Sequence, residues 1–313
     1  MGAFYETLPP SLITWLLQQK VFCIGSAPLS GAGHINVSPK GVTDRGGAGP
    51  FFGVIKESKS VPGKVYPPST STSTSTAGGG DDHDETDADN NNKDIVVRKF
   101  WYVDLTGSGI ETTSHLHEPG NGRITVMFMA FDGPPRILRL YGKGRVLEYG
   151  TPAFDEIVAS QGVKLIPGTR SIIVVDIDQV GTSCGFSVPK YDFVEYRPTL
   201  HEFFEKRVAN EKAGKREDGI ERYWAFKNAW SMDGLPGMQR GLHTAVTDNV
   251  KPIKKMVGPH APRVNGQYKP QRVFVLRHLI LAAVLSAVST VVMMFFLLRL
   301  VGVDIDIKEI LKR

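Results

Sequence analysis

The chain has 313 residues and a formal net charge of +5, and 41% of its residues are hydrophobic, so it can bury one sizeable core. Its two cysteines, Cys23 and Cys184, exclude a disulfide framework and fit a reducing compartment. The basic excess suits a phosphorylated ligand, a nucleic acid or a membrane surface, and charge alone does not choose among them.

The first 56 residues predict one helix and three short strands. Residues 8–20 (LPPSLITWLLQQK) begin near a proline pair and place Leu12, Trp15 and Leu16 on one face, which is typical of a helix. Short apolar runs at 21–28, 34–41 and 51–55 predict strands.

Residues 57–94 interrupt this pattern with a low-complexity stretch that includes STSTSTAGGGDDHDETDADNNNK. Because the stretch has almost no apolar side chains, burial cannot offset its chain entropy, and we expect a disordered insert. Its Asp and His residues could hold a divalent cation weakly, but a solvated loop is the favoured interpretation, and we predict no metal site.

Residues 95–190 predict more strands. Apolar runs at 95–105, 122–131, 135–147 and 171–180 are separated by tight turns and one helix near 152–160. Many strands with few helices favour a mainly β, α+β fold built on an antiparallel barrel formed by residues 1–56 and 95–190.

Residues 191–240 predict a helical extension, with an amphipathic helix over 198–230 and a turn-rich stop at 231–237. Residues 241–277 are rich in Pro and Lys and predict a basic linker. A transmembrane helix is expected at 278–300, followed by a short tail at 301–313.

The segment from Leu279 to Leu298, LILAAVLSAVSTVVMMFFLL, contains no charge, Pro or Gly. Twenty residues at about 1.5 Å each match a hydrocarbon core of about 30 Å, which favours a membrane span over a buried core helix. The 251–278 stretch has seven basic residues and no acidic one, so we expect a single-pass anchor with the N-terminal domain in the cytosol. The same stretch could bind anionic lipid headgroups.

Two segments carry candidate binding residues. In HINVSPKG, alternation along a strand places Asn36, Ser38 and Lys40 on one face, which suits an anionic ligand; the alternative is an ordinary solvated barrel edge. In DLTGSGIETTSHL, Thr112 and Ser114 fall where a helix would begin, and such positions attract phosphate; the alternative is a helix cap without a ligand.

The order of VSPKG, YVDLTGSGIETTSHL, NGRITVMF and PRILRLYGKGRV resembles the pyridoxamine 5'-phosphate oxidase-like, FMN-binding split-barrel family. The similarity runs from about Phe4 to Gly237, apart from the insert, and is strongest to a fungal-type branch with a DGLPG-containing C-terminal segment and, here, a C-terminal membrane anchor. The resemblance implies a six-stranded antiparallel split β-barrel, a homodimer, and FMN bound in a groove between subunits.

The resemblance also implies roles for particular residues. It places Ser38 and Lys40 on the strand that lines the flavin, and Thr112, Ser114 and His115 where the family holds the FMN phosphate. That site commonly reads Ser-Arg-Lys, whereas this chain has Ser114-His115-Leu116, which puts phosphate affinity in doubt.

A second motif of the family is an Arg-Gln pair near the isoalloxazine. The run Arg136-Ile137-Leu138-Arg139 keeps the Arg and replaces the Gln by Ile, which puts the substrate in doubt.

These observations predict an FMN-dependent oxidoreductase at a membrane, acting on a small-molecule substrate by two-electron transfer. The alternative is a non-catalytic module that binds or senses flavin, or another cofactor such as heme or a deazaflavin, because no acid/base pair emerges from the sequence. Nucleic-acid binding is not expected, since the basic residues cluster beside the predicted anchor rather than on the barrel strands.

Overall fold

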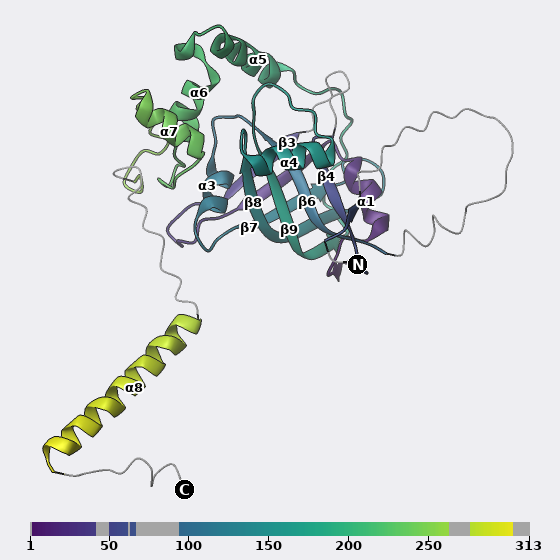
Figure 1. Ribbon diagram of the computed structural model, residues 1–313. Helices are drawn as coiled ribbons and strands as arrows, with labels where there is room; N and C mark the ends of the chain where they lie inside the picture. Colours follow the sequence, from purple (N-terminus) through teal and green to yellow (C-terminus); the bar gives the residue numbers. More distant parts are fainter. Residues whose placement is uncertain (1, 42–49, 62, 67–93, 263–275, 303–313) are drawn as a thin grey trace. The chain divides into compact units, whose positions relative to one another are not determined.

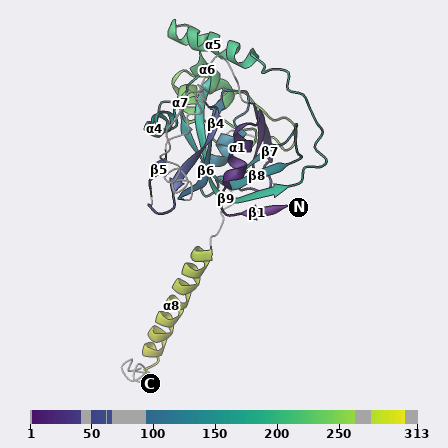
Figure 2. The ribbon, with the colours of Figure 1, turned by 90° about the vertical axis from the view of Figure 1, so that its right-hand side faces the viewer.

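The computed structural model describes residues 2–41, 50–61, 63–66, 94–262 and 276–302. The chain divides into two units, 1–269 and 270–313, and each is described by itself. The first unit is an antiparallel β-sheet with flanking helices (Figures 1 and 2). Its strands, in chain order, are β1 (Ala3–Tyr5), β2 (Val21–Ser26), β3 (Asn36–Gly41), β4 (Phe52–Ser58), β5 (Val65–Tyr66), β6 (Ile95–Leu105), β7 (Arg123–Met129), β8 (Ile137–Glu148) and β9 (Thr169–Ser183).

The sheet order is β3-β2-β7-β8-β9-β6-β4-β5, with β1 paired to β9. Every pairing is antiparallel, so the predicted barrel topology is confirmed. The six middle strands curve into a barrel in which β2 and β4 come together. The evidence is that the rings of Phe22 (β2) and Phe52 (β4) lie 5.2 Å apart, although these strands are not neighbours in the sheet. The fold is therefore a six-stranded split barrel with short strands at its edges.

Aromatic side chains fill the interior of the barrel. Phe100 and Tyr102 of β6 and Phe128 of β7 pack around Phe22 and Phe52 with ring centroids 5.2–6.3 Å apart. These five side chains are 0–4% exposed, as expected when alternate residues of each strand face inward.

The helices of the first unit lie outside the barrel. They are α1 (Pro10–Leu17), α3 (Glu111–His117), α4 (Pro152–Gln161), α5 (Thr199–Lys212), η1 (Arg216–Asp218), α6 (Ile220–Tyr223), the π-helical turn η2 (Trp224–Asn228) and α7 (Gln239–Thr247). Figures 1 and 2 show α5, α6 and α7 gathered at one end of the barrel.

The amphipathic helix expected over 198–230 is interrupted. α5 ends at Lys212, and the chain restarts as η1, α6 and η2. Gly214 adopts a φ of +74°, a left-handed conformation that glycine adopts without strain and that ends a helix. The apolar residues do lie in helices, but the helices on either side of Gly214, α5 and α6, run in different directions (Figure 1).

Two expected boundaries differ from the structure. Part of the stretch expected as an insert belongs to the sheet, because β4 continues to Ser58 and pairs with β5; residues 67–93 lie outside the described residues. The linker expected from residue 241 begins later, because α7 occupies its start and Val250 is only 7% exposed. Pro and Lys content alone did not reveal that the first residues of this stretch, up to Val250, pack against the domain.

The second unit contains one described helix, α8 (Leu276–Leu300). Within it, Ile280–Leu300 is long and apolar enough to cross a membrane by length and composition. Thr290 donates a hydrogen bond to the carbonyl of Ser286 at 2.9 Å, so this hydroxyl is satisfied inside the helix.

Candidate functional site

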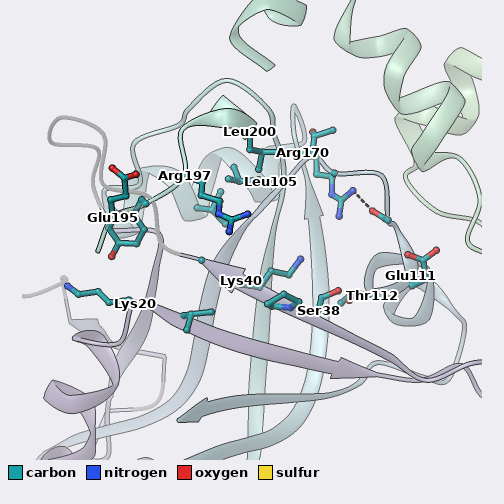
Figure 3. Close-up of a pocket in the computed structure, with 18 of the residues that line it drawn as sticks. Lys20, Ser38, Lys40, Leu105, Glu111, Thr112, Arg170, Glu195, Arg197 and Leu200 are labelled. Carbon is teal, nitrogen blue, oxygen red and sulfur yellow. Dashed lines mark hydrogen bonds between the residues drawn. The ribbon is translucent and has the colours of Figure 1, made fainter. Parts of the chain in front are cut away.

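A cavity of about 560 Å³ opens at one end of the barrel, beside β3. We call the chain between β6 and α3, residues 106–110, the pocket loop, and the chain between β9 and α5, residues 184–198, the strap. The pocket loop and the start of α3 line one side of the cavity, the strap lines another, and Lys40 lies between them (Figure 3). A cavity of this size is in the range of small-molecule sites.

The inward face of β3 carries the polar row expected from its sequence. Residues 36, 38 and 40 are half-buried while their neighbours 37, 39 and 41 are exposed. The Asn36 amide donates to the hydroxyls of Ser38, at 3.2 Å, and Thr112, at 3.0 Å, which ties β3 to α3. Ser38, Lys40 and Thr112 all line the cavity.

Lys40 belongs to a buried ion network that its sequence neighbours did not reveal. Its Nζ lies 2.8 Å from Asp104 Oδ1, and Arg170 Nε donates to Asp104 Oδ2 at 2.7 Å. Asp104 and Arg170 are 1% and 5% exposed. They meet because β6 and β9 pair in a register that sets Asp104 opposite Ser171.

Asp104 is ionised in this setting. Burial favours the neutral acid, but the adjacent cations Arg170 and Lys40 outweigh that effect and hold the pKa of the Asp104 carboxyl well below its usual range. The carboxylate therefore neutralises one of its two cations, and Lys40 still has ammonium protons to offer a ligand.

The C-terminal part of the unit holds the pocket loop in place. Trp224 Nε1 donates to Thr106 Oγ1 at 2.9 Å, and Asn228 donates to the carbonyl of Gly107 at 2.9 Å. From the barrel, Arg170 donates to the carbonyl of Gly109 at 2.7 Å (Figure 3). This Gly-containing loop is thus fixed by hydrogen bonds from distant parts of the chain.

The start of α3 differs from the open phosphate site expected there, because the Glu111 carboxylate already occupies the donors at this helix end. Its carboxylate accepts hydrogen bonds from the amides of Ile110, at 2.8 Å, and Met232, at 3.2 Å, and lies 3.4 Å from Lys255 Nζ. Burial raises the pKa of Glu111, but Lys255 and these amides outweigh it and hold that pKa below its usual value. A ligand phosphate would have to compete with this carboxylate.

Ser114 and His115 lie deeper than expected, on the buried side of α3. They are 1% and 0% exposed and do not line the cavity. His115 Nδ1 is hydrogen-bonded to the Ser26 hydroxyl at 2.9 Å, whereas Ser114 Oγ and His115 Nε2 have no partner among the described residues. Burial lowers the pKa of His115 to about 4, so the ring is neutral near pH 7 and carries no charge for a phosphate.

Arg136 and Arg139 lie apart from the other predicted residues. Arg136 lines a second cavity of about 430 Å³, with its guanidinium 5.2 Å from the centre of the Trp15 ring. Arg139 donates to Ser183, which lines the same second cavity, at 3.2 Å. One chain therefore groups Asn36, Ser38, Lys40 and Thr112, and it keeps Arg136 and Arg139 at another place.

Sequence reasoning missed the strap. Phe193, Tyr196 and Arg197 line the cavity from this segment, and Leu200 follows at the start of α5. The run YDFVEYRP (191–198) carries three aromatic residues between the last barrel strand and α5, and that clustering was the available signal.

Comparison with known proteins adds a relative of similar length. No family model matches the chain. The chain is 35% identical over 260 residues to the pyridoxamine 5'-phosphate oxidase family protein ustO of Aspergillus flavus, and the match covers 79% of this chain and 81% of that protein. The chain belongs to the pyridoxamine 5'-phosphate oxidase family. The resemblance seen in its motifs is thereby confirmed.

Among solved structures, the chain is similar to HupZ of Group A Streptococcus, with 11% identity and a TM-score of 0.30, over 59% of this chain and all of that one. It is also similar to an FAD-binding protein of Mesorhizobium loti, with 9% identity and a TM-score of 0.27, over 58% of this chain and 96% of that one.

Proposed function

We propose that this protein is a flavin-dependent oxidoreductase that binds FMN in the cavity beside β3. The observation that carries the proposal is the grouping of Ser38, Lys40 and Thr112 at one polar end of a cavity of about 560 Å³. Two hydroxyls and an ammonium are suitable donors for a phosphate. Family membership supports a flavin over other phosphorylated ligands.

The rest of the cavity fits the remainder of such a cofactor. Val103 and Leu105 of β6 and Phe193 of the strap supply apolar surface for a planar ring. FMN, when bound, supplies two-electron chemistry at its isoalloxazine ring. The chain itself supplies binding and orientation, with Asp104 and Arg170 holding Lys40 at the polar end.

We further propose a homodimer. Arg136 and Arg139 lie at the second cavity, so they reach a flavin bound beside β3 only if a second copy of the chain presents them. Phe4 of β1 and Val37 of β3 are 71% and 66% exposed, and burial of such side chains in an interface would stabilise a dimer. Sedimentation of the full chain in detergent, with and without FMN, tests the dimer, and a monomer in both states would contradict it.

We also propose that α8 anchors the protein in a membrane, with the barrel on the cytosolic side and the basic flank near lipid headgroups. The length and composition of Ile280–Leu300 support the span, and the Lys and Arg content of 251–278 supports the orientation. Protease protection of tags fused before Met1 and after Arg313 tests this topology in sealed membranes. With the cytosolic face outward, the protease should cleave only the tag before Met1. Any other cleavage pattern would contradict the proposed topology.

FMN binding is tested with the full chain in detergent by quenching of flavin fluorescence. We expect Lys40→Ala to weaken FMN binding by about tenfold or more, because charged hydrogen bonds contribute roughly 1.5–3 kcal/mol. Riboflavin, which lacks the phosphate, should bind weakly to both proteins. Arg145→Ala removes an exposed cation outside the cavity and serves as the control. A protein that is purified colourless and does not quench the fluorescence of added FMN would exclude the proposal.

The second candidate is a non-catalytic flavin-binding or sensing module. One observation favours it: Asp104 and Glu111 are ion-paired, and Glu195 is directed away from the middle of the cavity (Figure 3). No carboxylate of the described cavity residues is thus poised as a base. Substrate-dependent production of hydrogen peroxide that Lys40→Ala abolishes would decide for the enzyme, whereas FMN binding without turnover under any electron donor would decide for the module.

A further inference from the structure

The charged side chains around the cavity differ in how well they are neutralised. Lys40 and Arg170 share the carboxylate of Asp104. Lys20 lies with its Nζ 5.9 Å from the centre of the Phe193 ring and is directed away from Lys40 (Figure 3). The Arg197 guanidinium has no hydrogen bond, ion pair or aromatic ring against it within the described part of the chain, although it lines the cavity.

Arg197 is also oriented for a ligand. Figure 3 shows its guanidinium directed towards Lys40, while the carboxylate of Glu195, two residues earlier, is directed away. The Glu195 carboxylate is therefore not placed to pair with the Arg197 guanidinium. An unpaired guanidinium facing a cavity favours an anion, and its planar fork suits a carboxylate or phosphate with two parallel hydrogen bonds.

The strap places aromatic surface beside that cation. The rings of Phe193 and Tyr196 lie 4.7 Å apart with their planes at 56°, and both residues line the cavity. The Lys20 ammonium also lies over the Phe193 ring, a favourable cation–π contact. A ligand with an aromatic ring and an anionic group can contact this pair and Arg197 together.

We infer that the strap is the substrate-recognising wall of the cavity and that Arg197 binds the anionic group of an aromatic carboxylate or phosphate substrate. This inference rests on the proposed flavin site, whose donors Ser38, Lys40 and Thr112 lie across the cavity from the strap. It assigns the cofactor's phosphate to the barrel side of the cavity and the substrate's anionic group to the strap.

The test uses the full chain in detergent, loaded with FMN, and four small probes. Benzoate and phenyl phosphate carry a ring and an anion, benzyl alcohol carries only the ring, and acetate carries only the anion. Binding is followed by the change in the flavin absorption spectrum and by calorimetry. We expect both aromatic anions to bind about tenfold or more tightly than benzyl alcohol or acetate, since a charge-assisted pair contributes roughly that much. A preference for phenyl phosphate over benzoate would identify the anion as phosphate.

Arg197→Ala should abolish the preference for the aromatic anions, and Arg197→Lys should restore part of it. Lys190→Ala is the matched control, because Lys190 is exposed on the same strap and does not line the cavity. The Arg197 guanidinium makes no hydrogen bond or ion pair with the described residues, so its variants should unfold at the wild-type temperature.

Two failures can be told apart. If FMN does not bind but calorimetry shows Arg197-dependent binding of benzoate, the flavin proposal fails and the strap inference stands as an anion site. If FMN binds and benzoate binds no better than benzyl alcohol, or binds equally to wild type and Arg197→Ala, the strap inference is overturned. Absence of binding by all four probes overturns it as well.

Discussion

The pocket loop and the strap enclose the same cavity, but the protein holds them in different ways. Thr106, Gly107 and Gly109 of the pocket loop each accept a hydrogen bond from a residue at least 60 positions away in the chain. In the strap, among the described residues, only the amides of Val188 and Tyr191 donate backbone hydrogen bonds. The pocket loop is therefore fixed by hydrogen bonds to distant residues, whereas the described strap residues donate few backbone hydrogen bonds.

The difference suits the roles that we propose for the two walls. A cofactor site benefits from donors held in one geometry, because binding then costs little ordering of side chains. A wall that selects substrates carries its specificity in a few side chains, and loops on a rigid scaffold commonly provide these. Substitutions can test the comparison, since those beneath the fixed wall should change stability and those in the strap should change binding alone.

Asp104→Asn should have the largest effect. Removing the carboxylate leaves Arg170 buried without its counter-ion and frees Lys40, so we expect a loss of about 3–5 kcal/mol in the free energy of unfolding. Urea unfolding of the full chain in detergent measures it. Asp176→Asn breaks the exposed pair with Arg145 and should cost at most about 1 kcal/mol. Equal effects of the two substitutions would contradict a buried network beneath the fixed wall.

The same α3 side of the cavity should respond to pH through His115. Its pKa is lowered from about 6.5 when unfolded to about 4 in the fold, so the unfolded chain binds more protons between these values. Stability is therefore complete above pH 6.5 and falls as the pH is lowered towards 4. Between pH 7 and pH 5 we expect a loss of about 2 kcal/mol that His115→Gln removes. Identical pH dependence in the two proteins would show that His115 does not titrate as described.

Lys255 tests whether the chain after α7 helps to hold the fixed wall. Its Nζ lies 3.4 Å from Glu111 Oε1 and its side chain is 12% exposed, while the neighbouring Lys254 is exposed. Lys255→Met should cost about 1–2 kcal/mol, because Glu111 loses its cation but keeps two amide donors. Lys254→Met, which removes the same charge one position earlier, should stay within about 0.5 kcal/mol. Urea unfolding compares the pair, and equal effects would remove this segment from the wall.

Much of the fold could be predicted because its signals are local. Alternation along β3 placed Asn36, Ser38 and Lys40 on one face, and the structure brings all three to the cavity or its edge. The barrel strands followed from apolar runs between tight turns. The break at Gly214 was missed because a helical period continues on both sides of it.

The remainder depends on contacts between distant parts of the chain. Asp104 and Arg170 are 66 positions apart and meet only through the register of β6 and β9. The strap has no motif of its own, since its role follows from where it passes the cavity. Arg136 was grouped with Lys40 by family pattern, whereas a single chain keeps the two apart.

The smallest change in stability should come from the strap itself. Phe193 is 54% exposed, and Phe193→Ala should shift the free energy of unfolding by no more than about 0.5 kcal/mol. Leu105→Ala removes a half-buried apolar side chain that lines the same cavity and packs on the barrel core, and should cost about 1–2 kcal/mol. Phe193→Ala and Leu105→Ala should each weaken the binding of FMN, of benzoate or of both, because both residues line the cavity. Only Leu105→Ala should also lower the free energy of unfolding.

Limited digestion with chymotrypsin adds a kinetic measure of the same difference. Cleavage next to Tyr191, Phe193 or Tyr196 should precede cleavage in the barrel, because the strap has few hydrogen bonds to break before it fits a protease. Saturating FMN should slow cleavage next to Phe193, which the cofactor contacts, and not elsewhere in the strap. An aromatic anion should slow cleavage of the strap further, because it binds Arg197. If the strap resists cleavage as long as the barrel does, the two walls are equally fixed, and substrate selection must then be sought in side chains alone rather than in a segment free to adjust.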